Sequence, residues 1–330
     1  MGGGTYSSDI YRKTIGKAVR NGKSMAYSHA IQSGTAEAKA HRLLDPQYVN
    51  KAGLKIRECR DSDEHPDVTP IVVSFDLTGS NAAVAALSQD KLRLLYGMLL
   101  RRGICSDPAV CVAGYGDAYC DTVPLQISQF EASNAIDEAL DHIYLESGGG
   151  GNNGETATLL WYFVNKYSKV DAYELRGKKG YFFMIADECA LDLRPEHITK
   201  FIGEKADRQS LTAEANAKEL RERWNVFVLQ VDNNSARNQH APEKYAMLFE
   251  QEHVLPLDKP ENMIETIATA IGAIEETLTV SDAAEILKES GASDAAISTA
   301  MTAAGNLFSS SDKTGQTTIV ANIPDLNLND

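Results

Sequence analysis

The chain has 330 residues, 43% hydrophobic and 24% charged, which is the composition of a globular protein that can bury a core. Its length allows one large domain or two modest ones. The 32 Lys and Arg residues against 46 Asp and Glu residues give a net charge of −14, which argues against nucleic acid or anionic lipid as a partner. No run approaches about 18 apolar residues and the N-terminus lacks an apolar signal segment, so neither a membrane span nor secretion is predicted.

The charge is distributed unevenly along the chain. Residues 1–57 carry ten Lys and Arg against three acids, a net of +7, which leaves −21 for the remainder. Such asymmetry fits a basic arm that docks on an acidic surface of a partner or of the chain itself, and it fits a solvated leader equally well. The five cysteines are odd in number and contain no CxxC pair, which predicts reduced thiols and a cytoplasmic location.

The first 65 residues are predicted to form a basic, helical extension and a linker. Short amphipathic patterns occur at 10–19 and at 36–44, the second ending before Pro46. The stretch 59–70 is polar and contains two prolines, which is typical of a linker.

Buried strands and helices then alternate from residue 66 to about 280. Apolar, β-branched runs predict strands that are buried on both faces, as in a parallel sheet, and Pro124 favours an edge position for one of them. The alternation predicts an α/β fold with a doubly wound, mostly parallel sheet and helices on both faces. The expected strands are 71–76, 110–115, 122–127, 181–186, 226–231 and 253–257, and the expected helices are 84–100, 134–144, one from about 155, segments within 195–223, one after 242, and 260–278.

Residues 281–330 differ in composition from the part before them. They are rich in Ala, Ser, Thr and Asp, with seven acids against two lysines. We expect one or two short helices up to about Gly305 and an acidic tail beyond. The sequence therefore divides into an N-terminal extension (1–65), one large α/β domain (66–280) and an acidic, partly helical C-terminal tail (281–330).

Oxygen-bearing side chains follow two of the predicted strands. Asp76, Thr78 and Ser80 are spaced i, i+2, i+4 on a tight loop, and Asp187 ends another strand. Ligands of open α/β sheets bind at the carboxyl ends of the strands, so these side chains would face one point if the two strands are neighbours. A carboxylate with two hydroxyls suits a hard divalent cation. Two carboxylates at such a short separation would repel each other unless a cation lay between them.

The DLTGS segment at 76–80 resembles the first motif of the metal-ion-dependent adhesion site of von Willebrand factor type A domains, which reads Asp-x-Ser-x-Ser. Thr78 replaces the first serine and keeps the hydroxyl. The segment 114–128 resembles the second and third strands of these domains, 136–155 resembles the helix and glycine-rich loop of the second motif, and MIADE resembles the third motif. The resemblance covers about 66–280.

This resemblance implies a protein-recognition module without a chemical reaction. The implied cation is Mg²⁺, or Mn²⁺ or Ca²⁺, and a protein partner would supply an acidic residue to complete its coordination. Members of the family usually place a threonine in the glycine-rich loop, whereas alignment here gives Glu155, with Thr156 beside it. Glu155 would add a third carboxylate, or it would fill the position of the partner's acid. The implied ligands are thus Asp76, Thr78, Ser80, Asp187 and either Glu155 or Thr156.

Three enzyme interpretations compete with this hypothesis. DLTGS also resembles the phosphorylated motif Asp-Lys-Thr-Gly-Thr of haloacid-dehalogenase-type pumps, which would make Asp76 the nucleophile of a Mg²⁺-dependent phosphatase or phosphotransferase, but Leu77 replaces the lysine. The run GGGGNNGE lacks the lysine of a phosphate-binding loop. Cys189 follows Glu188, which would raise the pKa of its thiol and disfavour a nucleophile.

Overall fold

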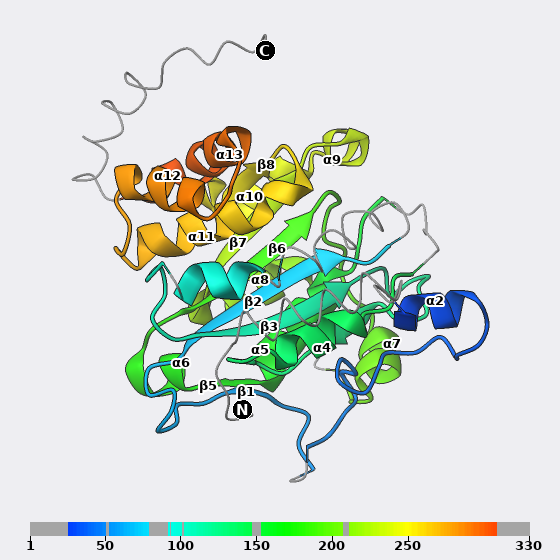
Figure 1. The fold of residues 1–330 in the computed structure, drawn as a ribbon. Coiled ribbons are helices and arrows are strands. Elements are labelled where there is room, and N and C mark those ends of the chain that lie inside the picture. The colour runs from blue at the N-terminus through cyan, green and yellow to red at the C-terminus, as the bar shows by residue number, and fades with distance from the viewer. Residues whose placement is uncertain are drawn as a thin grey trace.

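The computed structural model describes residues 26–50, 53–78, 92, 94–100, 102–146, 153–206 and 211–308. A six-stranded sheet of order β4-β3-β2-β6-β7-β8 lies at the centre of this described part (Figure 1). Every neighbouring pair is parallel except β3 and β4, so the predicted doubly wound α/β fold is confirmed. The strands are β2 (Thr69–Asp76), β3 (Pro108–Tyr115), β4 (Leu125–Ile127), β6 (Gly180–Ala186), β7 (Trp224–Val231) and β8 (Val254–Leu257).

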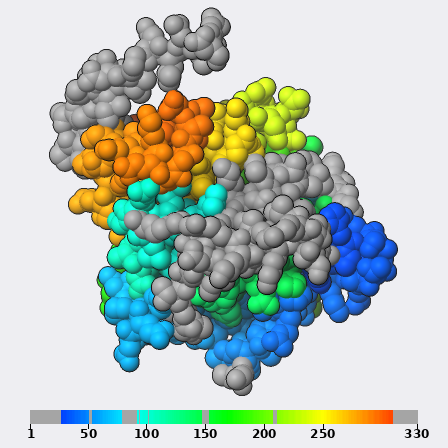
Figure 2. All heavy atoms as spheres, viewed as in Figure 1, coloured from blue at the N-terminus to red at the C-terminus, as the bar shows by residue number. Residues whose placement is uncertain are grey.

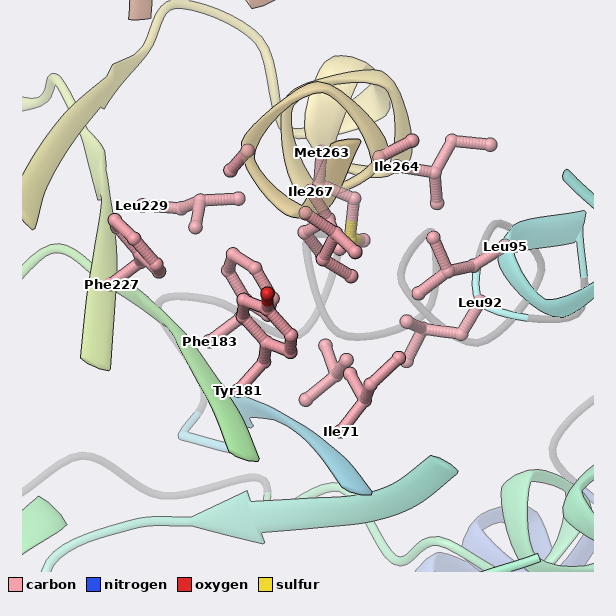
Figure 3. Close-up of a cluster of buried hydrophobic side chains, with 14 of the residues drawn as sticks. Ile71, Leu92, Leu95, Tyr181, Phe183, Phe227, Leu229, Met263, Ile264 and Ile267 are labelled. Atoms are coloured by element: carbon pink, nitrogen blue, oxygen red, sulfur yellow. The ribbon is translucent and has the colours of Figure 1, made fainter. Parts of the chain in front are cut away.

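The central strands are buried on both faces because successive side chains point to opposite sides of a strand. Alternate residues of β2, β6 and β7 therefore enter two separate cores. Figure 3 shows part of one core, with Tyr181, Phe183 and Phe227 lying between the strands and Met263 and Ile267 of helix α11. Residues of the first core include Ile71, Val73, Phe75, Tyr181, Phe183, Ile185, Phe227 and Leu229, and those of the second include Val72, Phe182, Met184, Val226 and Val228.

Helices cover both faces of the sheet, as right-handed crossovers require. The first core is covered by the helical residues 92 and 94–100 and by α4 (Ala135–Asp141), α11 (Met263–Ile274), α12 (Val280–Glu289) and α13 (Asp294–Ala304). The second is covered by α5 (Ala157–Tyr167), α8 (Ala213–Arg223) and α10 (Ala241–Phe249). Shorter elements are α2 (Ala26–Gln32), α6 (Asp171–Arg176), α7 (Pro195–His197), α9 (Asn234–Gln239), the π-helix η2 (Ile198–Ile202) and the 3-10 turns η4 (Gln251–His253), η5 (Pro260–Asn262) and η6 (Gly305–Leu307).

The helix predicted at 36–44 is wrong, because the structure has turns and bends there. Ala36, Ala38 and Ala40 pack at alternate positions against a small cluster that contains Tyr144. A spacing of two is the period of an extended chain, so these tertiary contacts override the helical propensity of the alanines. The amphipathic pattern at 10–19 lies outside the described residues.

The end of the predicted N-terminal extension is attached to the α/β domain by main-chain and side-chain bonds. Strand β1 (Arg57–Cys59) pairs in parallel with β5 (Ser168–Val170), a small sheet that the sequence did not reveal. The guanidinium of Arg57 is buried and donates to the carbonyls of Ile127 and Asp45. The Leu44 carbonyl accepts the N–H of Ile127 at 2.8 Å, on the outer side of β4.

The two helices predicted after residue 280 are present and belong to the first core. Leu287 of α12 and Ala300 of α13 are buried in the same cluster as the sheet residues. Arg102 donates to Glu289 at 2.8 Å, and Figure 1 shows α12 and α13 beside α11. In Figure 2 the orange atoms of α12 and α13 adjoin the cyan atoms of the segment that includes residues 94–100. The division of the chain at 65 and 280 remains a prediction. Within the described ranges, no helix has both the length and the apolar character that crossing a bilayer requires.

Candidate metal centre

Asp76 and Asp187 lie at the same edge of the sheet. Strands β2 and β6 are parallel, hydrogen-bonded neighbours with Phe75 opposite Ile185, so the condition under which the two acids share an edge is met. Asp76 is the last residue of β2 and Asp187 is the first after β6, and both are buried. The strand order reverses between β2 and β6, so the two carboxylates lie at the topological switch point where ligands of such sheets bind.

The loop after β2 brings Thr78 back toward Asp76. The N–H of Thr78 donates to Asp76 Oδ1 at 2.8 Å, and the N–H of Leu77 donates to the Tyr115 carbonyl at 2.8 Å. Thr78 Oγ1 is buried and has no hydrogen-bond partner. A buried hydroxyl of this kind is costly unless a ligand satisfies it. Ser80, the next predicted ligand, lies outside the described residues.

Glu155 is held against the segment that follows β6. Its N–H donates to the Cys189 carbonyl at 2.9 Å, and its own carbonyl accepts the N–H of Leu191 at 2.8 Å, which forms a parallel bridge between Glu155 and Ala190. The side chain is buried, and Glu155 Oε2 has no hydrogen-bond partner. The structure thus places a second unsatisfied oxygen beside the loop that carries Asp187.

Thr156 makes a structural connection instead. Its Oγ1 donates to the Gly116 carbonyl at 2.8 Å and accepts the N–H of Ala118 at 2.7 Å. The hydroxyl therefore ties the start of α5 to the loop after β3. Of the two alternatives for the loop ligand, Glu155 is the one whose oxygen lacks a protein partner.

The acids at this edge act on one another electrostatically. Burial, followed by the negative charge of Asp76, raises the pKa of Glu155 to about 10. Two buried tyrosines, Tyr115 and Tyr245, interact with the same charges. Burial is the main cause that raises their pKa values, and the charges of Asp76, Asp187 and Glu155 raise them further. The negative charge of Asp76 and the burial of Glu155 therefore disfavour the ionised form of Glu155 in the absence of a cation.

Asn233, which the sequence analysis missed, contacts Asp187 directly. Asn233 Nδ2 donates to Asp187 Oδ2 at 2.7 Å. An Asn ahead of a helical segment signals a helix cap, but its contact with a residue 46 positions earlier depends on the sheet order. Asp117, at the end of β3, uses Oδ1 to accept the N–H of Tyr119 and so forms a turn.

The donor set fits a hard divalent cation in its chemistry. Carboxylate and hydroxyl oxygens are the ligands that Mg²⁺, Mn²⁺ and Ca²⁺ prefer, and two of those present, on Thr78 and Glu155, are buried without partners. Among the residues that the structure describes, however, no group of three or more His, Cys, Asp and Glu side chains is arranged to hold a metal ion. The candidate oxygens therefore share one edge of the sheet without forming a complete cluster.

Glu155→Gln is expected to flatten the pH dependence of stability when divalent cations are removed with EDTA. Between the ordinary pKa of 4.5 and about 10, folded Glu155 keeps a proton that the unfolded chain has released. The free energy of unfolding therefore falls as pH rises, by at most about 1.4 kcal/mol per pH unit for this group. Glutamine does not ionise, so the variant lacks this pH dependence. In urea unfolding at pH 6–9, the free energy of unfolding of the variant should therefore rise relative to that of wild type as pH rises.

The matched control for this measurement is Glu285→Gln on the exposed face of α12, which should keep the wild-type slope. Identical slopes for wild type and Glu155→Gln would contradict a buried, protonated Glu155.

The described residues thus form an α/β domain with a mostly parallel sheet and two strand-end acids at its switch point. No family model and no curated protein matches the sequence. Solved structures match at 12% identity: the pilus adhesin SpaC of Lactobacillus rhamnosus GG has a TM-score of 0.44 over 64% of this chain and 31% of that chain. The chain thus matches about a third of the length of the adhesin.

Two further solved structures that match the chain are described by a vWF domain or by a MIDAS motif. The vWF domain of the type V pili tip protein Mfa5 of Porphyromonas gingivalis is 12% identical, with a TM-score of 0.39 over 62% of this chain and 94% of that chain. Proximal thread matrix protein 1 of the mussel byssus, solved with a zinc-occupied MIDAS motif, is 12% identical, with a TM-score of 0.41 over 63% of this chain and 48% of that chain.

Proposed function

We propose that this chain is a metal-dependent protein-recognition module whose cation is bound at the carboxyl edge of β2 and β6. One observation carries the proposal. Asp76 and Asp187 end neighbouring parallel strands at the switch point, and at the same edge two buried oxygens, on Thr78 and Glu155, have no hydrogen-bond partner. Hard oxygen donors in such a place are best satisfied by a divalent cation.

The proposed ligands are Asp76, Thr78, Ser80 and Asp187, with Glu155 favoured over Thr156 because the Thr156 hydroxyl already bonds two main-chain groups. A bound Mg²⁺ would neutralise the charge of the carboxylates and leave coordination positions for water or for an acidic side chain of a partner. Glu155 determines how open the site is, because its carboxylate competes with that acid. Mn²⁺ or Ca²⁺ would use the same oxygens.

The setting of this module is also part of the proposal. A cytoplasmic protein within a larger assembly agrees with the five cysteines, all of which are free. The basic N-terminal extension and the acidic remainder of the chain have opposite charge, which supports docking on an acidic partner or association between copies of the chain.

No observation favours the phosphatase alternative. Leu77, at the position of the pump lysine, is buried, and Gly114 lies against its side chain so closely that a Cβ there would be 2.3 Å from Leu77 Cδ1. The position therefore belongs to the core. Hydrolysis of p-nitrophenyl phosphate by wild type, lost in Asp76→Asn, would reverse this conclusion.

Asp76→Asn is expected to abolish the stabilisation of the protein by Mg²⁺. The substitution keeps the shape of the side chain and removes the charge that attracts the cation. Binding at 100 times the dissociation constant stabilises a folded protein by about 2.7 kcal/mol, which a thermal melt detects as a rise in Tm. Wild type should show this rise and Asp76→Asn should not.

Asp294→Asn, in the exposed first turn of α13, is the control and should respond to Mg²⁺ as wild type does. An undiminished response of Asp76→Asn would place any cation elsewhere. If the module works as proposed, EDTA should release a protein partner that was bound in the presence of Mg²⁺. Binding that is unchanged by EDTA would show that the interaction uses another surface.

A further inference from the structure

The carboxylate of Asp187 is held by a side chain from the next strand of the sheet. Asn233 follows β7 and donates its Nδ2 to Asp187 Oδ2 at 2.7 Å. Asp187 is 1% exposed and Asn233 is half-buried, so this hydrogen bond is partly shielded from solvent and restricts the rotation of the carboxyl group. Asn233 thus contacts one of the two strand-end acids of the candidate site.

The orientation of the Asn233 amide follows from a second bond. Asn233 is the N-cap of α9, and its Oδ1 accepts the N–H of Ala236 at 2.9 Å. Because the oxygen must face the helix, the amino group must face Asp187. Ser, Thr and Asp cap helices about as well as Asn does, but none of them can offer an amide N–H to Asp187 at the same time.

The other end of α9 is bound to the same loop. Gln239, the last residue of α9, accepts the N–H of Cys189 with Oε1 at 3.0 Å, and Tyr245 of α10 donates to the Glu188 carbonyl at 2.7 Å. The Cys189 carbonyl in turn accepts the N–H of Glu155. The segment from Asp187 to Cys189 is therefore fixed from α9 and α10 on one side and from Glu155 on the other.

We propose that Asn233 is a positioning residue of the cation site, which orients the Asp187 carboxylate through its amide N–H while it caps α9. The inference rests on the proposed function, since it concerns the affinity of the same site for a divalent cation. Residues that hydrogen-bond a metal-binding carboxylate restrict its geometry, and their loss typically weakens metal binding about 10- to 100-fold.

The test separates the two roles of Asn233. Asn233→Ser keeps an N-cap oxygen and removes the amide donor, and Asn233→Ala removes both. The control for loss of a cap alone is Ser293→Ala. Ser293 is the N-cap of α13, and its Oγ accepts the N–H of Ala296. The dissociation constant of Mg²⁺ is measured by calorimetric titration of the full chain, and the urea midpoint is measured in EDTA.

We expect Asn233→Ser to bind Mg²⁺ about 10- to 100-fold more weakly than wild type with a urea midpoint close to that of wild type. Asn233→Ala should show the same loss of affinity together with a lower midpoint, and Ser293→Ala should show the lower midpoint alone. Wild-type affinity in Asn233→Ser, while Asp76→Asn fails to bind, would overturn the positioning role and leave the site intact. Binding by Asp76→Asn as tight as that of wild type would overturn the proposed site and the inference together.

Discussion

Removal of residues 281–330 is expected to unfold the α/β domain or to lower its free energy of unfolding by at least about 5 kcal/mol. Helices α12 and α13 bury Ala283, Leu287 and Ala300 in the same core as β2, β6 and β7, and Phe308 beyond them belongs to it as well. Each large apolar side chain that is returned to water costs about 1.5–3 kcal/mol, and a typical domain has only about 5–15 kcal/mol in total. The truncation would also expose the apolar face of α11.

Far-ultraviolet circular dichroism and urea unfolding check this expectation. Deletion of 309–330 alone is the comparison variant, because it keeps α12, α13 and Phe308, and a loss of stability confined to the longer deletion would assign the effect to these parts. Leu287→Ala is a milder probe of the same interface and should cost about 2–5 kcal/mol. A chain ending at 280 that unfolds with the midpoint of the full chain would support the division at 280 as a true domain boundary.

Gly154→Ala is expected to destabilise the protein by about 2–4 kcal/mol and to weaken its response to Mg²⁺. Gly154 has φ +155°, and a Cβ there would lie 2.7 Å from the Cys189 carbonyl oxygen. That oxygen accepts the N–H of Glu155, so the backbone cannot relieve the clash without breaking this bond. The substitution therefore displaces Glu155 from the segment that carries Asp187.

Gly177→Ala provides the matched control. Gly177 also has a positive φ, +65°, but a Cβ there would meet nothing within 4 Å. It should show only the cost of the left-handed conformation, about 1 kcal/mol, with an unchanged response to Mg²⁺. Equal losses of stability and equal Mg²⁺ responses in the two variants would contradict a special role for the close contact at Gly154.

The sequence predicted the sheet well because its central strands carry a signal that depends only on local composition. The run 181–186 is apolar throughout and the run 71–76 is mostly so, since both faces of each strand are buried. The same reasoning placed Asp76 and Asp187 at strand ends, and the strand order then brought them together. The helix expected at 36–44 failed because alanines have high helical propensity, whereas contacts of alternate residues with the cluster that contains Tyr144 hold this segment in turns and bends.

Other parts of the candidate site had no local signal. Whether Glu155 or Thr156 keeps a free oxygen depends on Gly116 and Ala118, which lie about forty positions earlier in the loop after β3. The contact of Asn233 with Asp187 likewise exists only because β6 and β7 are neighbours. Such pairings are set by tertiary structure, and a single sequence does not encode them in any pattern of spacing.

The chain up to Arg57 covers part of the outer edge of strand β4. Strand β4 is an outermost strand, and an exposed outermost strand is a template for pairing with another chain. Here the Leu44 carbonyl bonds the outward N–H of Ile127, while the Arg57 guanidinium bonds the Ile127 carbonyl. Proteolytic loss of the chain up to Arg57 would uncover both groups of Ile127 and leave the edge of β4 open to pairing with another chain.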